Sequence, residues 1–94
     1  MEEIFVNRVE ASTEKHLPVV TISNQFVEVK VGLVTHPMED EHYINFVAVE
    51  TTNGYIIKTL AQHELPECKI YVGEDKVISV YEYCNLHGLW KIDI

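Results

Sequence analysis

The Asn53-Gly54 dipeptide constrains the fold of this chain more than any other feature. It lies between two runs rich in β-branched and aromatic residues, at 43–52 and 55–60. A type I′ turn needs positive φ at both central positions, which asparagine and glycine tolerate best. The pattern therefore predicts an antiparallel hairpin with Asn53 and Gly54 at the centre of its turn.

The rest of the chain shows the same β pattern. Valines alternate with charged residues across 27–31, the period of two that is typical of a half-buried strand. Further strands are predicted at residues 4–9, 18–23, 67–72, 76–84 and 90–94. No segment has a sustained helical period, so the fold class is all-β. Short strands separated by turns predict an immunoglobulin-like antiparallel β-sandwich of about seven strands, and the cysteine pair flanking a tryptophan that marks a true immunoglobulin domain is missing.

Length and charge limit the domain count and the partners. A chain of 94 residues predicts one domain over residues 1–94. The net charge of −8, with seven basic residues scattered among fifteen acidic ones, argues against nucleic acid. No stretch is long enough to span a membrane, and residues 1–5 lack the features of a signal peptide. We therefore expect a cytoplasmic protein in which Cys68 and Cys84 are reduced.

Cys84 and His87 form the one local motif that indicates chemistry. Two residues separate them, just after a predicted strand, and a loop of that spacing lets a thiolate and an imidazole converge on one metal ion. A soft thiolate with an imidazole suits iron or zinc and disfavours magnesium or calcium. Taken alone, the motif is equally compatible with an ordinary loop that holds a buried cysteine.

Three more histidines lie at predicted strand ends, where a rigid sheet can hold a side chain and still expose a site. They are His16, His36 and His42. Any single histidine is more often a surface or core residue than a ligand, so a site without metal stays open at this point. The other chemistry-bearing residues fall outside the pattern. We expect His63 to be a solvated turn residue, Cys68 a small buried hydrophobe and residues 39–41 a solvated acidic loop.

Three motifs together resemble a known family. They are Glu14-Lys15-His16-x-Pro18, then His36-Pro37-Met38 with His42-Tyr43-Ile44, and finally Tyr83-Cys84-Asn85-Leu86-His87-Gly88-Leu89-Trp90. In this order they resemble the superoxide reductases, and more narrowly the iron-binding domain shared by neelaredoxin and the C-terminal half of desulfoferrodoxin. The motifs span nearly the whole chain, and the last of them is very specific.

The resemblance implies a ligand set and a reaction. One mononuclear iron would be held by an axial Cys84 thiolate opposite an open position, and by four equatorial imidazoles, those of His16, His36, His42 and His87. Superoxide would be reduced by one electron to hydrogen peroxide. Lys15 would attract the anion and organise the water that protonates the peroxide, and Glu14 would occupy the sixth position of the oxidised iron. A rubredoxin-like protein would donate the electron, and the chain would form a homodimer or homotetramer.

The chain departs from the family pattern in three ways. It lacks the cysteine-rich module that binds a second iron in desulfoferrodoxin, so we expect no second iron centre. Phe46 stands where the family usually has tryptophan, and residues 55–67 are short, which puts oligomer contacts in doubt. Two other functions remain as alternatives. One is a zinc-binding structural module with a closed tetrahedral site, and the other is an iron electron-transfer module without catalysis.

Overall fold

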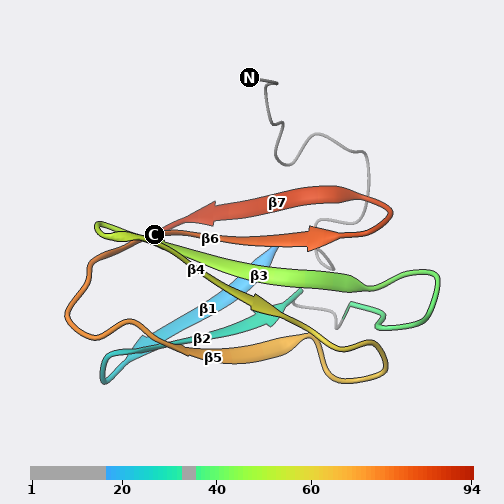
Figure 1. Cartoon of the computed structure of the whole chain (residues 1–94), viewed down its shortest axis with the longest axis horizontal. Coiled ribbons are helices and arrows are strands. Elements are labelled where there is room, and N and C mark those ends of the chain that lie inside the picture. Colours follow the sequence, from blue (N-terminus) through green and yellow to red (C-terminus); the bar gives the residue numbers. More distant parts are fainter. Residues whose placement is uncertain (1–16, 33–35) are drawn as a thin grey trace.

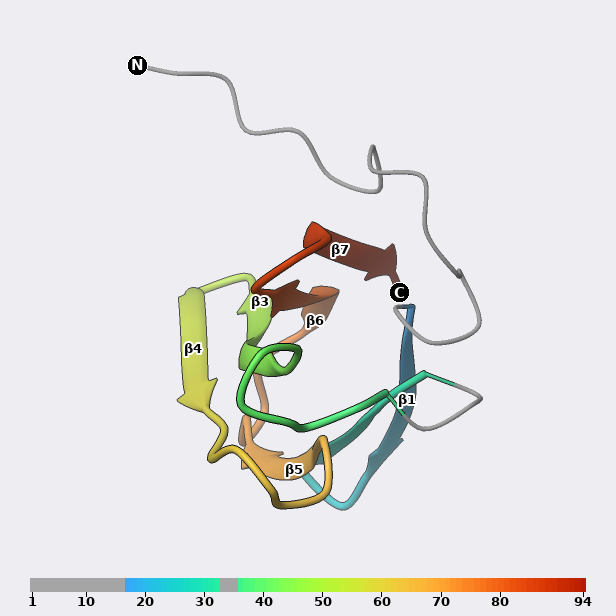
Figure 2. The same cartoon turned by 90° about the vertical axis from the view of Figure 1, so that its right-hand side faces the viewer.

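The described residues, 17–32 and 36–94 of a computed structural model, form two antiparallel sheets. The strands are β1 (Pro18–Ser23), β2 (Phe26–Val31), β3 (Ile44–Thr51), β4 (Gly54–Thr59), β5 (Glu67–Tyr71), β6 (Val77–Cys84) and β7 (Gly88–Asp93). One sheet has the order β1-β2-β5 and the other β4-β3-β6-β7, and the two form facing layers (Figures 1 and 2). The predicted all-β sandwich of about seven strands is confirmed. The strand predicted at residues 4–9 lies outside the described residues.

The β3–β4 hairpin forms, but the prediction for its turn is wrong by one residue. Thr51 pairs with Gly54, so Thr52 and Asn53 are the central residues and Gly54 begins β4 with a φ of +129°. Asn53 does not have the positive φ of a type I′ turn. Hydrogen bonds explain the shift, because the Asn53 backbone N–H donates to Thr51 Oγ1 and its side chain donates to Asp75 Oδ1 at 2.7 Å.

The type I′ signature is found instead in the β1–β2 hairpin. Its central residues, Asn24 and Gln25, have φ of 51° and 71° and connect the paired residues Ser23 and Phe26. Asparagine is one of the side chains that tolerate this left-handed conformation. Glutamine has no such preference, which explains why the sequence does not reveal this turn.

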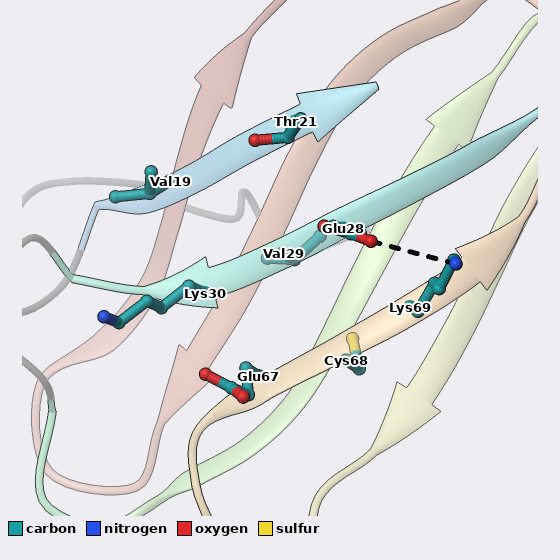
Figure 3. A pocket seen from close by; sticks show the side chains of 8 residues that line it. All are labelled: Val19, Thr21, Glu28, Val29, Lys30, Glu67, Cys68 and Lys69. Atoms are coloured by element: carbon teal, nitrogen blue, oxygen red, sulfur yellow. Dashed lines mark ion pairs between the residues drawn. The ribbon is translucent and has the colours of Figure 1, made fainter. Parts of the chain in front are cut away.

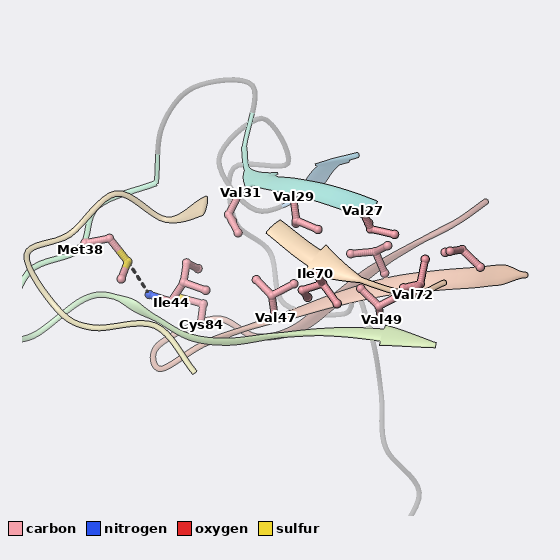
Figure 4. Packing of buried hydrophobic residues seen from close by; sticks show 12 residues of the cluster. Val27, Val29, Val31, Met38, Ile44, Val47, Val49, Ile70, Val72 and Cys84 are labelled. Carbon is pink, nitrogen blue, oxygen red and sulfur yellow. Dashed lines mark hydrogen bonds between the residues drawn. The ribbon is translucent and has the colours of Figure 1, made fainter. Parts of the chain in front are cut away.

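The core fills the space between the inner faces of the two sheets (Figure 4). It is built mainly from small β-branched side chains, including Val27, Val29, Val47, Val49 and Val80, each at most 2% exposed. Burying a side chain of this size stabilises the fold by roughly 1.5–3 kcal/mol relative to its exposed state. In Figure 4 the valines give way at one end of the core to Met38, Ile44 and Cys84. The predicted ligands His36, His42 and Cys84 lie at that end of the sandwich.

A β-bulge in β3 shapes this end. Ile44 pairs with Cys84 and Phe46 with Tyr83, so Asn45 is an extra residue opposite the β6 strand. The bulge reverses the alternation of side chains, and Ile44 consequently points into the core with no exposed surface. Phe46 lies on the outer face, where its ring stacks on Tyr83 at 5.7 Å. Strands account for all regular structure in the described part, and no helix there is long and apolar enough to cross a membrane.

Candidate metal centre

Three of the predicted ligands lie together at the end of the sandwich that the bulge shapes. Cys84 is the last residue of β6, and His36 and His42 occupy the two ends of the segment that leads into β3. One ligand atom from each of these residues lies within 4.8 Å of the other two. His36 is 1% exposed and Cys84 has no exposed surface, whereas His42 is half-buried. Two of the three side chains are therefore enclosed by protein, and the third is partly exposed.

A fourth predicted ligand, His87, lies beside this cluster. Its Nδ1 atom is 3.8 Å from Cys84 Sγ. The His42 ring lies between two other imidazoles, with its centroid 4.6 Å from that of His36 and 5.0 Å from that of His87. Trp90, on β7, donates its indole N–H to the His87 carbonyl at 3.1 Å and so fixes the turn on which His87 lies. The fifth predicted ligand, His16, lies outside the described residues, as do Glu14 and Lys15.

Hydrogen bonding at His36 decides which ring nitrogen can bind a metal. His36 Nδ1 is 2.7 Å from the carbonyl oxygen of Pro37. Because a carbonyl only accepts, Nδ1 carries the proton and the lone pair of the neutral ring is on Nε2. Such a second hydrogen bond is the usual device that orients a ligating imidazole and fixes its tautomer.

The surroundings of Cys84 have opposing effects on the pKa of its thiol. Burial is the largest effect and raises the pKa of the Cys84 thiol, and the nearby Glu82 carboxylate raises it further. Hydrogen bonds from the backbone N–H groups of Leu86 and His87 lower the same pKa. A metal that binds here must displace the thiol proton, so metal affinity should rise with pH. The two N–H groups then stabilise the thiolate within the turn.

Glu82 is the least expected buried group near the cluster. It has no exposed surface, and neither carboxyl oxygen has a hydrogen-bond partner among the described residues. Burial raises the pKa of Glu82 to about 9, so its carboxyl is neutral at pH 7. Glu82 and Cys84 are two residues apart on β6 and therefore face the same side of the sheet.

Asn85 connects the two segments that carry the cluster, a role that the motif alone does not reveal. Its side-chain Oδ1 accepts the Tyr43 backbone N–H at 2.8 Å, and its Nδ2 donates to the Glu41 carbonyl at 2.9 Å. Its own backbone N–H donates to the Tyr43 carbonyl at 3.1 Å. These three bonds flank His42 on both sides. Asn85 therefore sets the position of His42 relative to Cys84.

A second link, also absent from the sequence prediction, joins the same loop to the segment between β4 and β5. His63 donates its backbone N–H to the Met38 carbonyl at 2.6 Å, and its Nε2 lies 2.6 Å from Asp40 Oδ1. His63 is exposed, as predicted, but it is not merely a solvated turn residue. Its φ of 68° places it in the left-handed region, which no feature of the Gln62-His63-Glu64 sequence indicates.

Two minor predictions can be compared directly with the structure. Residues 39–41 are exposed, as expected of an acidic loop. Cys68 is half-buried and packs against the core, so it is less enclosed than predicted. A surface hollow of about 550 Å³ lies over β1, β2 and β5, and none of the cluster residues lines it (Figure 3).

The donor set fits a first-row transition metal. Metal–nitrogen and metal–sulfur bonds of about 2.0–2.3 Å place the ligands of one ion roughly 4.4 Å apart at most. The spacing of the His36, His42 and Cys84 atoms reaches this range with an adjustment of a few tenths of an ångström. Imidazole with thiolate suits iron, zinc and copper, and the set lacks the oxygen ligands that magnesium and calcium require.

The fold and the cluster define an all-β sandwich domain with a candidate histidine–cysteine metal site. Residues 8–93 match the family model described as Desulfoferrodoxin. The chain is 38% identical over 93 residues to the desulfoferrodoxin of Desulfarculus baarsii, an alignment that covers 99% of this chain and 73% of the relative. The chain therefore belongs to the desulfoferrodoxin family, the iron-binding superoxide reductases.

Solved structures agree with this assignment. The superoxide reductase from Treponema pallidum has a TM-score of 0.91 and 43% identity, with coverage of 96% of this chain and 75% of that one. Superoxide reductase (1Fe-SOR) from Giardia intestinalis has a TM-score of 0.70 and 26% identity, and the alignment covers 87% of this chain and 100% of that one. These relatives indicate an oxidoreductase.

Proposed function

We propose that this chain reduces superoxide by one electron to hydrogen peroxide at a single iron. The proposed ligands are His16, His36, His42, His87 and Cys84. The observation that carries the proposal is the convergence of His36, His42 and Cys84 to within 4.8 Å in a member of an iron-binding family. A relative named as a one-iron superoxide reductase supports one iron per chain, without a second centre.

The overall reaction consumes one superoxide, one electron and two protons and yields one hydrogen peroxide. Iron held by these residues would supply one-electron redox chemistry between its ferrous and ferric states. The Cys84 side chain contributes negative charge and soft sulfur donation, which the Leu86 and His87 N–H groups moderate. The Pro37 carbonyl orients His36, and Asn85 holds the His42 segment against the Cys84 turn. These contacts support the placement of His36 and His42 in the proposed site.

Two residues outside the described part complete the proposal. Lys15 is proposed to attract superoxide towards the site, since a chain with a net charge of −8 otherwise repels anions. It is also proposed to organise the water that protonates the peroxide. Glu14 is proposed as a carboxylate that would bind the oxidised iron. Their adjacency to His16 in the sequence supports both roles.

The electron donor, the compartment and the domain count remain proposals of the same kind. A small rubredoxin-like protein is the donor that the family resemblance suggests. The absence of a disulfide between Cys68 and Cys84 is compatible with a reducing cytoplasm. A single domain over residues 1–94 and assembly into a dimer or tetramer are likewise predictions.

The decisive experiment measures metal and product stoichiometry on anaerobically purified protein. We expect one iron per chain and, with an electron donor supplied in excess of superoxide, one peroxide formed for each superoxide consumed. A dismutase would give one peroxide for every two superoxides, together with oxygen. Oxidation should also produce a thiolate-to-iron charge-transfer band. Tightly bound zinc that does not exchange for iron, or iron without peroxide production, would contradict the proposal and favour a structural or electron-transfer module.

A further inference from the structure

Met38 lies in the middle of the segment that carries two of the proposed ligands. It comes two residues after His36 and four residues before His42. Its side chain is 7% exposed and belongs to the hydrophobic core, at the end where Ile44 and Cys84 also lie (Figure 4). A buried methionine is commonly a flexible side chain that fills a gap in the core. One contact of its sulfur indicates a more specific role.

The sulfur of Met38 accepts a hydrogen bond from the main chain. The Ile44 backbone N–H donates to Met38 Sδ at 3.2 Å, and Ile44 has no exposed surface (Figure 4). A thioether is a weak acceptor, whereas a backbone N–H is a strong donor that normally pairs with a carbonyl oxygen. The position of Ile44 in the sheet explains why a sulfur takes the place of that carbonyl.

The strand register directs the Ile44 N–H away from β6. Ile44 lies opposite Cys84. One position further along, the Asn85 N–H donates to the Tyr43 carbonyl at 3.1 Å. In an antiparallel ladder such a bond flanks a non-hydrogen-bonded pair, so the main-chain groups of Ile44 point away from Cys84.

On the opposite side of β3, strand β4 ends before it reaches Ile44. The last pair between the two strands is Phe46 with Thr59. A buried N–H that finds no acceptor destabilises a fold more than an ordinary hydrogen bond stabilises it. The Met38 sulfur supplies the acceptor that β4 does not. It therefore completes the hydrogen bonding of β3 at the residue that pairs with the Cys84 ligand.

Two backbone bonds hold the rest of the Met38 segment. The Met38 carbonyl accepts the His63 N–H at 2.6 Å, from the segment between β4 and β5. The neighbouring Glu39 N–H donates to the His42 carbonyl at 2.9 Å and closes the turn between these two residues. Met38 is thus held at its sulfur, at its carbonyl and through its neighbour. Its position determines where the chain passes between His36 and His42.

We propose that Met38 is a positioning residue for the metal centre. Its sulfur fixes the loop between His36 and His42 against β3 and so sets the separation of these two imidazoles from Cys84. The inference deepens the proposed function and rests on the ligand set given there. Asn85 acts on the same loop from β6 and bonds the two neighbours of His42, whereas Met38 lies between both histidines.

A packing role is the alternative, and the two roles differ in what the sulfur does. A core filler needs only volume and apolar surface, and volume-conserving changes of buried side chains are well tolerated. A positioning role needs a lone pair on the sulfur. Met38→Leu changes the shape and the acceptor together and does not separate the roles. Norleucine keeps the length of methionine with a CH₂ group in place of sulfur, and selenomethionine keeps an acceptor, so this pair of analogues separates them.

The composition of the chain makes these analogues practical. Its two methionines are Met1 and Met38, so replacement of methionine during expression changes one residue of the described part. Both analogues also replace Met1, which makes selenomethionine the matched control for norleucine. Amide hydrogen exchange on the metal-free protein tests the hydrogen bond itself. We expect the Ile44 N–H to exchange about 10-fold faster with norleucine, and at the wild-type rate with selenomethionine.

Cobalt(II) tests the effect on the metal centre, because its visible spectrum depends on the type and geometry of its ligands. We expect the selenomethionine protein to bind Co²⁺ with the affinity and spectrum of the wild type. Norleucine should weaken Co²⁺ binding about 10-fold and shift the ligand-field bands, since residues that orient ligands typically have effects of this size. Thermal unfolding of the metal-free proteins checks that both analogues fold.

The outcomes separate this inference from the proposed function. Equal Co²⁺ affinities and spectra for the norleucine and selenomethionine proteins would overturn the role of Met38 and leave the proposed function intact. Weaker binding with unchanged ligand-field bands would indicate a packing effect and would overturn the positioning role as well. Wild-type protein that binds no Co²⁺ would instead contradict the ligand set, and with it both proposals.

Discussion

The outer faces of the two sheets differ in degree. In the described part, the three-stranded sheet has one aromatic pair, Phe26 with Tyr71, beside its charged pairs, and the four-stranded sheet has two aromatic pairs. On the three-stranded sheet, charged residues of opposite sign face one another across β2 and β5, as Lys30 with Glu67 and Glu28 with Lys69 (Figure 3). On the four-stranded sheet, Phe46 stacks on Tyr83 and Tyr55 lies beside Tyr81, where Glu50 and Lys91 also contact the Tyr81 side chain. The centroids of these two pairs are 5.7 Å and 6.3 Å apart. Cross-strand ion pairs suit contact with water, whereas aromatic surface suits contact with protein.

The two sheets also differ in what they contribute to the candidate metal centre. The four-stranded sheet provides Cys84, the bulge at Asn45 and the apolar edge of β4. No cluster residue lies within a strand of the three-stranded sheet, which closes the core and faces solvent. Each sheet contains one cysteine, Cys84 on β6 and Cys68 on β5. Substituting each of these two cysteines in turn is the most direct test of whether only the four-stranded sheet contributes to the candidate metal centre.

Cys84→Ser should have the largest effect of any substitution. It removes the soft ligand, so we expect loss of the ferric–thiolate absorption and of most superoxide reduction. The matched change on the other sheet, Cys68→Ser, should leave iron content and the spectrum unchanged. Visible spectroscopy and metal analysis of both variants make the comparison. A retained band in Cys84→Ser would refute its assignment as a ligand.

Glu82→Gln should change how stability depends on pH. The pKa of Glu82 is about 9 in the folded chain and about 4.5 when exposed, so the folded state retains a proton across that window. The free energy of unfolding must therefore fall as pH rises from about 4.5 to 9. At pH 7 the substitution should stabilise metal-free protein by about 3 kcal/mol.

Urea unfolding of the metal-free protein at pH 5, 7 and 9 measures this effect. The control on the three-stranded sheet is Glu28→Gln, a change of the same type at a side chain that is 59% exposed. Identical pH profiles for wild type and Glu82→Gln would show that the buried carboxyl is ionised or hydrated in solution.

Asn85→Ala should weaken metal binding without removing a ligand. The substitution deletes the side-chain bonds to Tyr43 and Glu41 that hold the His42 segment. Residues that orient ligands typically contribute 10–100-fold to metal affinity, and we expect a loss of that size. Iron competition with a chelator measures it, and Asn53→Ala at the far hairpin is the control. An unchanged affinity would mean that the loop keeps its position without Asn85.

Lys15→Ala should slow the bimolecular reaction with superoxide several-fold while iron binding stays intact. The reason is electrostatic, since a local cation near the site offsets the net negative charge. Pulse radiolysis at increasing ionic strength measures it, with Lys69→Ala on the three-stranded sheet as control. If wild type and Lys15→Ala show the same rates at every salt concentration, the steering role is excluded.

His63→Asn should have the smallest effect. It removes the contact with Asp40, while asparagine tolerates the positive φ at this position. Both side chains are well exposed, so we expect a loss of less than about 1 kcal/mol in the free energy of unfolding. Thermal unfolding measures it. A larger loss, accompanied by release of iron, would show that this contact controls the His36–His42 loop.

The strand pattern made most of the fold predictable, and local hydrogen bonds explain where it failed. Alternation at 27–31 and the apolar runs at 18–23 and 67–72 indicate strands because burial acts on every second side chain. The shift of the hairpin turn depends on Asp75, which is 22 residues from Asn53 in sequence. A propensity rule that considers only the turn residues cannot predict a contact between residues so far apart in the sequence.

The sequence by itself determined most of the strands, the family and the residue types of the candidate metal centre, because these depend on local periodicity and on motifs of fixed spacing. Only the tertiary structure decided that Asn85 joins the two ligand-bearing segments, that Glu82 is buried without a described partner and that β4 has an open apolar edge. These features arise from register and from contacts between distant segments. They depend on which strands become neighbours, and no local pattern specifies that order.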